Sequence, residues 1–130
     1  QTTQIIFDGK ILPKGDLVIE NFPKLVAIAI PDHDEPERMS SLPKVQIRNC
    51  PQLKQVKIIL FEVQNFSISD CPKVEKLDLR YNELTSLNIS ELVNLVDLDC
   101  SSNSLTTLDI SHNLKLKVLE CDDDLKPKIS

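Results

Sequence analysis

The stretch SELVNLVDLDCSSNSLTTLDIS (residues 90–111) repeats a pattern that the chain has already used once. Residues 69–90 read SDCPKVEKLDLRYNELTSLNIS, so leucine or another apolar residue returns at the same places after 21 residues. Self-similarity at a fixed period is the signature of a protein built from stacked structural units. The sequence therefore predicts a repeat protein, in which each residue must be interpreted by its position in the repeat.

The period extends through most of the chain. Equivalent apolar anchors lie 28, 21, 21 and 21 residues apart, at Leu25, Leu53, Val74, Leu95 and Leu116. A second set of apolar pairs lies between these anchors, at Leu17/Ile19, Val45/Ile47, Phe66/Ile68, Leu87/Ile89 and Leu108/Ile110. Each repeat thus has two apolar zones, and because one repeat cannot bury its own apolar side, the repeats are expected to stack.

The motifs VEKLDLRYNEL and LVDLDCSSNSL share the pattern L-x-x-L-x-L/C-x-x-N-x-L. This pattern resembles the leucine-rich repeat, in the short 21-residue form common in bacterial and early-diverging fungal proteins, most strongly over residues 71–121. The resemblance implies a mainly β solenoid of about five coils with little helix, whose short strands stack in parallel ~4.8 Å apart around a leucine core. We expect a single domain over residues 1–130, divided into an N-terminal cap and half-coil (1–19), five repeats (20–121) and a C-terminal tail (122–130).

The local pattern indicates where the strands lie. The alternating segments, such as Lys76–Arg80 and Asp97–Ser101, are expected to form a concave sheet with leucines inward and polar residues outward. The second apolar zone also alternates and ends on isoleucine, which predicts short strands or extended chain on the opposite face rather than helix. Asn82 and Asn103 come three residues after the last apolar residue of the concave-sheet segments, where a side-chain amide can bind backbone groups as the chain turns.

Four cysteines could form two disulfides or a zinc site. Their places in the repeat favour another interpretation, because Cys50 and Cys71 share one apolar position while Cys100 and Cys121 share another. Stacked side chains that point the same way fit the ~90° dihedral angle of a disulfide poorly. We therefore predict four buried free thiols that act as small apolar side chains.

The thiols also bear on the compartment. Reduced cysteines are typical of the cell interior, so a cytoplasmic location is expected. Asn65-Phe66-Ser67 and Asn88-Ile89-Ser90 match the acceptor pattern for N-glycosylation, which keeps secretion open as the alternative.

Composition argues against several classes of function. With two glycines, no tryptophan and a net charge of −5, the chain has neither a glycine-rich phosphate loop nor the basic, aromatic face of a nucleic-acid binder. No apolar run approaches the ~18 residues that cross a membrane. His33 and His112 are the only histidines, and no catalytic motif is present. We expect a non-enzymatic protein without cofactor, nucleic-acid partner or membrane association.

The segment PDHDEPER, Pro31–Arg38, accounts for the one spacing of 28 residues. Its acidic residues and His33 could bind a metal or a partner, whereas the alternative is a solvated insertion near one end of the solenoid. No second cluster of ligands at metal spacing accompanies the segment, so no metal site is predicted.

The outward positions of the predicted concave sheet carry a graded charge. The face begins with Ala27 and Ala29, continues through Gln55, Lys57 and Ile59, and ends with Val118 and acidic residues. Residues 1–65 contain eight basic and eight acidic residues, whereas residues 66–130 contain seven and twelve. Asp78, Asp99 and Glu120 would stack on adjacent strands, where like charges repel unless a partner neutralises them. The candidate partner-binding residues are Lys57, Lys76, Asp78, Arg80, Asp97, Asp99, Ser101, Glu120 and Asp122.

These features predict a protein-interaction module that binds a protein or peptide partner with basic residues through this face. Two alternatives stay open. One is a recognition domain for a glycan or another non-protein ligand, although the face has few aromatic residues. The other is a structural unit that self-associates end to end through the open edges of its sheet. The protein is therefore expected to be either a monomer or an end-to-end assembly.

Overall fold

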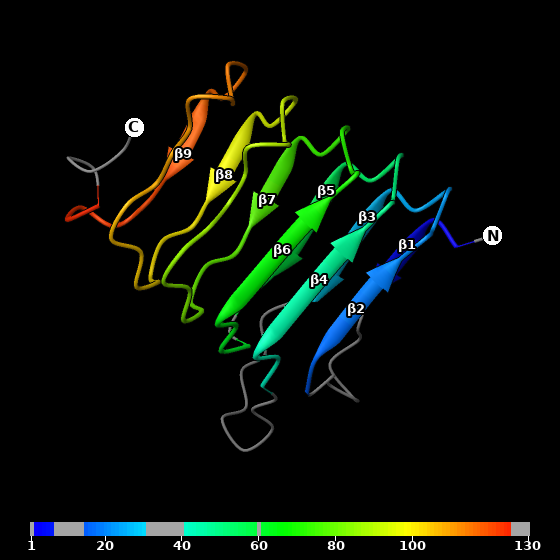
Figure 1. Ribbon diagram of the computed structural model, residues 1–130, viewed down its shortest axis with the longest axis horizontal. Helices are drawn as coiled ribbons and strands as arrows, with labels where there is room; N and C mark the ends of the chain where they lie inside the picture. Colours follow the sequence, from blue (N-terminus) through cyan, green and yellow to red (C-terminus); the bar gives the residue numbers. More distant parts are fainter. Residues whose placement is uncertain (1, 7–14, 31–40, 60, 126–130) are drawn as a thin grey trace.

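The computed structural model describes residues 2–6, 15–30, 41–59 and 61–125. This part of the chain contains short β-strands and no helix, and every strand pairing in it is parallel. The strands are β1 (Gln4–Ile6), β2 (Leu17–Glu20), β3 (Ala27–Ile30), β4 (Lys44–Arg48), β5 (Gln55–Ile58), β6 (Asn65–Ser69), β7 (Lys76–Asp78), β8 (Asp97–Asp99) and β9 (Val118–Glu120) (Figure 1). The prediction of a mainly β protein made of short parallel strands is confirmed.

The strands form two sheets with the core between them. One sheet has the order β1-β3-β5-β7-β8-β9, and the other has the order β2-β4-β6. From β1 to β7 the chain alternates between the sheets, so each pass adds one strand to each (Figure 1). Val56 and Leu77 of the first sheet and Val45 and Phe66 of the second belong to a single hydrophobic cluster. The two apolar zones of the repeat are therefore the two sides of one core.

The strand pairing has the period that the sequence indicates. Val56 pairs with Leu77, Leu77 with Leu98 and Leu98 with Leu119, each step being 21 residues. Ile59 is an exception to the predicted register, because it is buried, with 3% of its surface exposed, instead of pointing outward. β5 ends one residue before Ile59, and the alternation of side chains between the two faces ends with the strand.

The second apolar zone forms strands in its first three copies. The residues directly after β2, β4 and β6 adopt the left-handed conformation, at Asn21 (φ 64°), Asn49 (φ 51°) and Asp70 (φ 54°). Asn and Asp tolerate this conformation better than other side-chain-bearing residues do. The sharp turn they permit sends the chain from the three-stranded sheet back to the six-stranded one.

The next two copies of this zone are extended chain with local turns and form no strand, apart from an isolated β-bridge at Leu108. Asn88 Oδ1 accepts hydrogen bonds from the Ser90 backbone N–H (3.0 Å) and hydroxyl (2.7 Å), and Asp109 Oδ1 accepts one from the Ser111 N–H (2.8 Å). Such side-chain bonds offer the backbone an alternative to sheet pairing. The predicted mixture of short strands and extended chain is thus found, with the strands in the earlier copies.

β7 and β8 end two residues earlier than predicted, at Asp78 and Asp99 rather than at Arg80 and Ser101. In each case the carboxylate of the last strand residue accepts a hydrogen bond from the backbone N–H two residues later, at 3.3 Å for Arg80 and 3.1 Å for Ser101. This is an Asx turn, which directs the chain out of the sheet. The aspartates that end the strands therefore also begin the turns.

Asn82 joins neighbouring repeats through its side chain. Its Oδ1 accepts hydrogen bonds from the backbone N–H groups of Phe61 and Val63, both at 3.1 Å, and its Nδ2 donates to the carbonyl of Ile58 at 2.8 Å. Asn103 repeats much of this arrangement one repeat later. The predicted role of these amides is confirmed, and their bonds extend to the preceding repeat as well as to their own turn.

No disulfide joins the four cysteines, as predicted. Cys50, Cys71 and Cys100 are buried, whereas the expectation of full burial is wrong for Cys121, which is half-buried. The reason is its position next to β9, which has only β8 as a neighbour among the described strands.

The N-terminal segment adds a strand to the main sheet. β1 pairs with β3, with Gln4 opposite Ala27, and Ile5 packs against the hydrophobic core. Residues 2–6 of the predicted cap thus supply β1, the first of the six strands in this sheet. The predicted insertion Pro31–Arg38 and residues 126–130 of the predicted tail lie outside the described residues.

Candidate functional site

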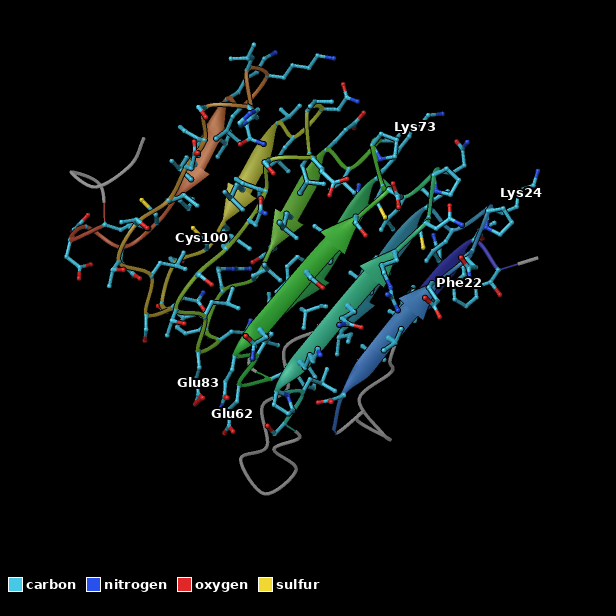
Figure 2. All side chains as sticks on the ribbon, viewed as in Figure 1. Phe22, Lys24, Glu62, Lys73, Glu83 and Cys100 are labelled. Atoms are coloured by element: carbon cyan, nitrogen blue, oxygen red, sulfur yellow. The ribbon has the colours of Figure 1, made fainter. Side chains whose placement is uncertain are left out.

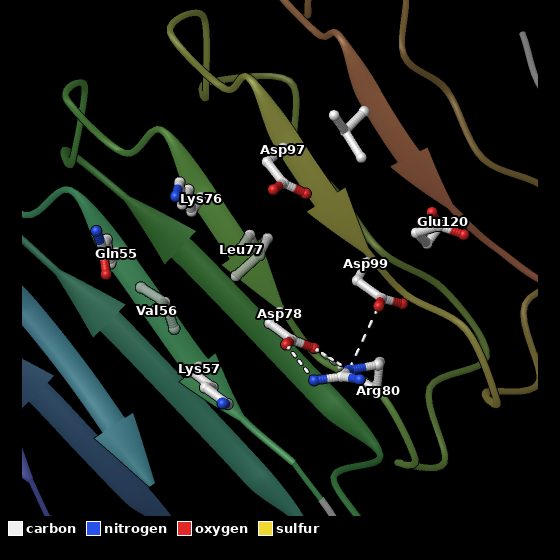
Figure 3. A pocket seen from close by; sticks show the side chains of 11 residues that line it. Gln55, Val56, Lys57, Lys76, Leu77, Asp78, Arg80, Asp97, Asp99 and Glu120 are labelled. Carbon is white, nitrogen blue, oxygen red and sulfur yellow. Dashed lines mark hydrogen bonds and ion pairs between the residues drawn. The ribbon is translucent and has the colours of Figure 1, made fainter. Parts of the chain in front are cut away.

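Most of the predicted partner-binding residues lie on the outer face of the six-stranded sheet, and those on the strands form rows that cross the sheet (Figure 3). The pairing places Lys76 beside Asp97 in one row. The next row consists of Lys57, Asp78, Asp99 and Glu120, on β5, β7, β8 and β9. Two residues along a strand separate the rows, which corresponds to ~7 Å.

A shallow depression of about 360 Å³ opens over these four strands. All of the predicted residues line it except Ser101 and Asp122. Gln55 (Figure 3) and Val118 line it as well. The sequence register had placed both on this face, but an uncharged side chain gave no reason to include either of them in the site.

Arg80 pairs with two of the carboxylates in this depression. Its guanidinium forms a bidentate contact with Asp78, at 3.0 Å from Nε and 2.9 Å from Nη2, and its Nε lies 3.3 Å from Asp99 Oδ2 (Figure 3). The hydrogen bond with Asp78 is the main cause that raises the pKa of Arg80 above its ordinary value, so the guanidinium stays charged. The expected repulsion between Asp78 and Asp99 is therefore relieved inside the protein and gives no argument for a partner.

Two of the predicted site residues hold neighbouring backbone instead. The Ser101 hydroxyl donates a hydrogen bond to Asp99 Oδ1 at 2.7 Å. Asp122 accepts hydrogen bonds from the backbone N–H groups of Ser102 (2.8 Å) and Asn103 (3.3 Å), which belong to the preceding repeat. Because of these contacts, Ser101 and Asp122 belong to the turns beside the depression. Neither residue lines the depression itself.

The other four charged side chains of the site remain available. Within the part of the chain that the structure describes, no hydrogen bond or ion pair engages the side chains of Lys57, Lys76, Asp97 or Glu120. Lys57, Lys76 and Glu120 are exposed, and Asp97 is half-buried. The lysines stand on β5 and β7, and the carboxylates stand on β8 and β9, so the two signs occupy different halves of the depression.

Other charged residues gather at the two ends of the strands. Lys24 and Lys73 lie beside one end of the strands, and Glu62 and Glu83 lie beside the other (Figure 2). A second depression, over β4 and β6, is lined in part by Asn65 and Asn88, the two asparagines of the glycosylation pattern. Both asparagines are exposed.

The described ranges contain no group of three or more His, Cys, Asp or Glu side chains that could hold a metal ion. They also contain no helix that could span a bilayer.

Comparison of the chain with protein-family models, with curated proteins and with solved structures finds no match.

Proposed function

We propose that this protein is a solenoid of the leucine-rich-repeat type that acts as a non-enzymatic interaction module. It binds a protein or peptide partner through the outer face of the six-stranded sheet. The 21-residue steps between paired strands and the asparagine side chains that join one repeat to the next support the repeat architecture.

The observation that carries the proposal is the set of four charged side chains without an internal partner, Lys57, Lys76, Asp97 and Glu120, around one depression. Charged groups that pair inside a protein contribute to its fold, as Arg80 does. Charged side chains without such a contact can form ion pairs with a partner. The strands hold their backbone in place before binding, which lowers the entropic cost of association.

Affinity capture with the immobilised protein tests this proposal. Asp97→Lys combined with Glu120→Lys is expected to abolish retention of partner proteins, because the change reverses two charges that no internal contact uses. Asp99 is left unchanged, since its reversal would also break contacts with Arg80 and Ser101. Retention is also expected to fall with added salt, because ~0.15 M salt screens exposed charges beyond ~8 Å.

The matched control is Glu83→Lys combined with Glu91→Lys, which changes the net charge equally at exposed positions away from the depression. Partners that bind the parent and this control but not the first variant support the face as the binding surface. Equal retention by all three proteins argues against it.

Self-association is the second candidate, because β1 and β9 each have a neighbour on one side only among the described strands. A parallel edge of this kind can pair with another chain. Light scattering over a concentration series tests it, and a constant monomer mass excludes it. A glycan-binding function has less support, since no aromatic side chain among the described residues lines the depression.

A further inference from the structure

The halves of the depression differ in sign, and this difference specifies the chemistry of a partner. Lys57 and Lys76 occupy adjacent strands, β5 and β7, in neighbouring rows. Asp97 and Glu120 occupy the next two strands, β8 and β9, in the same two rows. The centres of the two pairs are therefore two strand spacings apart, or ~10 Å.

The charged groups in the middle of the depression are already paired with one another. Arg80 lies between the two halves and contacts both Asp78 and Asp99 (Figure 3). A cation from a partner would have to compete with this guanidinium for either carboxylate. Lys57 and Lys76 on one side, and Asp97 and Glu120 on the other, can bind a partner without breaking an existing contact. A partner therefore gains most affinity by contacting both sides.

The neighbouring uncharged residues fit the same division. Val118, 44% exposed, lines the depression in the same row as Asp97, where the aliphatic stem of a lysine or arginine can pack while its charge reaches a carboxylate. Gln55 is exposed beside Lys76, and its amide can donate a hydrogen bond to a carboxylate.

We propose that the face recognises a segment carrying charges of both signs, with a carboxylate over Lys57 and Lys76 and a lysine or arginine over Asp97 and Glu120, ~10 Å apart. This inference rests on the interaction function proposed above. It replaces the partner expected from the sequence, a protein or peptide with basic residues, by a segment that carries charges of both signs. Residues three apart in a polyproline-II segment fulfil the spacing, since they lie on one side of the helix and ~9 Å apart.

Synthetic proline-rich peptides of one length provide the probe, and chemical-shift changes in the ¹⁵N-labelled protein at low ionic strength provide the measurement. The first peptide has one aspartate and one lysine three residues apart, the second has the same residues adjacent, and the third has two lysines three residues apart. The first peptide is expected to give saturable shifts on β5, β7, β8 and β9, and the other two are expected to give smaller shifts at the same concentration.

Charge-reversed proteins sharpen the test. Asp97→Lys with Glu120→Lys is expected to lose the shifts caused by the first peptide. Adding Lys57→Glu and Lys76→Glu to that variant exchanges the two halves, so binding is expected to return with the peptide turned round. The spectra themselves report whether each variant remains folded, and Glu83→Lys with Glu91→Lys serves again as the control.

Binding of the two-lysine peptide as tightly as the first peptide overturns the mixed-charge proposal and leaves the interaction function intact. Failure of the four-site exchange to restore binding, in a variant with the parent's fold, also overturns it. So does an absence of shifts with all three peptides, whereas the interaction function is judged by the affinity capture alone.

Discussion

The cysteines show how the pKa and the reactivity of a side chain depend on its position in the repeat. Cys71 and Cys100 occupy apolar positions, where burial is the largest of the causes that raise the pKa of Cys71 to about 11 and that of Cys100 to about 12. The Cys71 thiol also donates a hydrogen bond to the carbonyl of Ser69 at 3.2 Å. Because the thiolate is the reactive form, both residues should be inert at neutral pH.

Thiol titration of the native protein checks this expectation. Cys121 is expected to react first because its side chain is half-buried, and Cys50, Cys71 and Cys100 are expected to react slowly because they are buried. All four should titrate after denaturation. Cys121→Ser should remove the fast phase, and fewer than four reactive thiols in the denatured parent would contradict the absence of disulfides.

The raised pKa values also predict the effect of alkaline pH on stability. Below the ordinary value of 9.0, these thiols are protonated in both the folded and the unfolded chain, so their contribution to stability is fully present. Between pH 9 and about 11 the unfolded chain loses protons that the folded protein still holds at Cys71, so the free energy of unfolding should fall as pH rises. Urea unfolding at several pH values measures this slope, which should flatten in Cys71→Ala combined with Cys100→Ala.

At the scale of the strand, alternation between the two faces decides which residues carry stability. In β8 the central residue Leu98 is fully buried, whereas Asp97 and Asp99 on either side are half-buried on the outer face. A shift of one residue in the register would exchange these roles along the whole strand. The register is therefore open to a direct test by substitution.

Leu98→Ala is expected to lower the free energy of unfolding by about 2–5 kcal/mol, because truncation of a buried leucine loses packing and leaves a cavity. Asp97→Ala should change it by less than ~0.5 kcal/mol, since its side chain makes no contact that supports the fold. Denaturant unfolding measures both changes. Equal losses in the two variants would show that the register is wrong.

The buried asparagines support the turns between strands to different extents. Asn82→Leu removes the acceptor for the backbone N–H groups of Phe61 and Val63, and each buried donor that is left unsatisfied costs about 1–3 kcal/mol. We expect a loss of about 2–4 kcal/mol in the free energy of unfolding, measured with urea.

Asn113→Leu is the matched comparison. Within the described residues, the buried Oδ1 of Asn113 has no hydrogen-bond partner, and the carbonyls of Ile89 and Leu92 that its Nδ2 contacts also accept backbone N–H groups. Leucine already occupies the equivalent position in the preceding repeat, at Leu92. This variant should be neutral or more stable, and a loss as large as that of Asn82→Leu would contradict the distinction.

At the scale of the whole molecule, each described strand pairs only with its neighbours in its own sheet, so local stability depends on position. β5, β7 and β8 pair on both sides, whereas β9 pairs with β8 alone and its Leu119 is only half-buried. In a stacked repeat protein the terminal units lack one interface and open more easily than the central ones.

Hydrogen exchange of the native protein tests this gradient. Backbone amides of β5 and β7 are expected to exchange most slowly, and those of β9 are expected to exchange fastest among the paired strands. A uniform rate across the six-stranded sheet would show instead that the stack opens as one cooperative unit.

The sequence alone determined the period, the parallel β class, the inward leucines and the absence of disulfides. These features are encoded locally and repeated, so each copy of the motif supports the interpretation of the others. Most of the outward register was equally readable, because alternation along a strand needs no knowledge of its neighbours. Ile59 was misassigned where the strand ends, since the end of a strand is set by turns and contacts rather than by the period.

Only the tertiary structure decided which charges remain available for a partner. Arg80 reaches Asp99 across the gap between β7 and β8, and Asp122 binds the backbone of Ser102 in the preceding repeat. Both contacts join residues about 20 positions apart in the sequence, which stacking brings within one strand spacing of ~4.8 Å. From the sequence, Arg80 and Asp122 were predicted to bind a partner just as Lys57 and Glu120 were, because a list of charges does not show which of them are already paired.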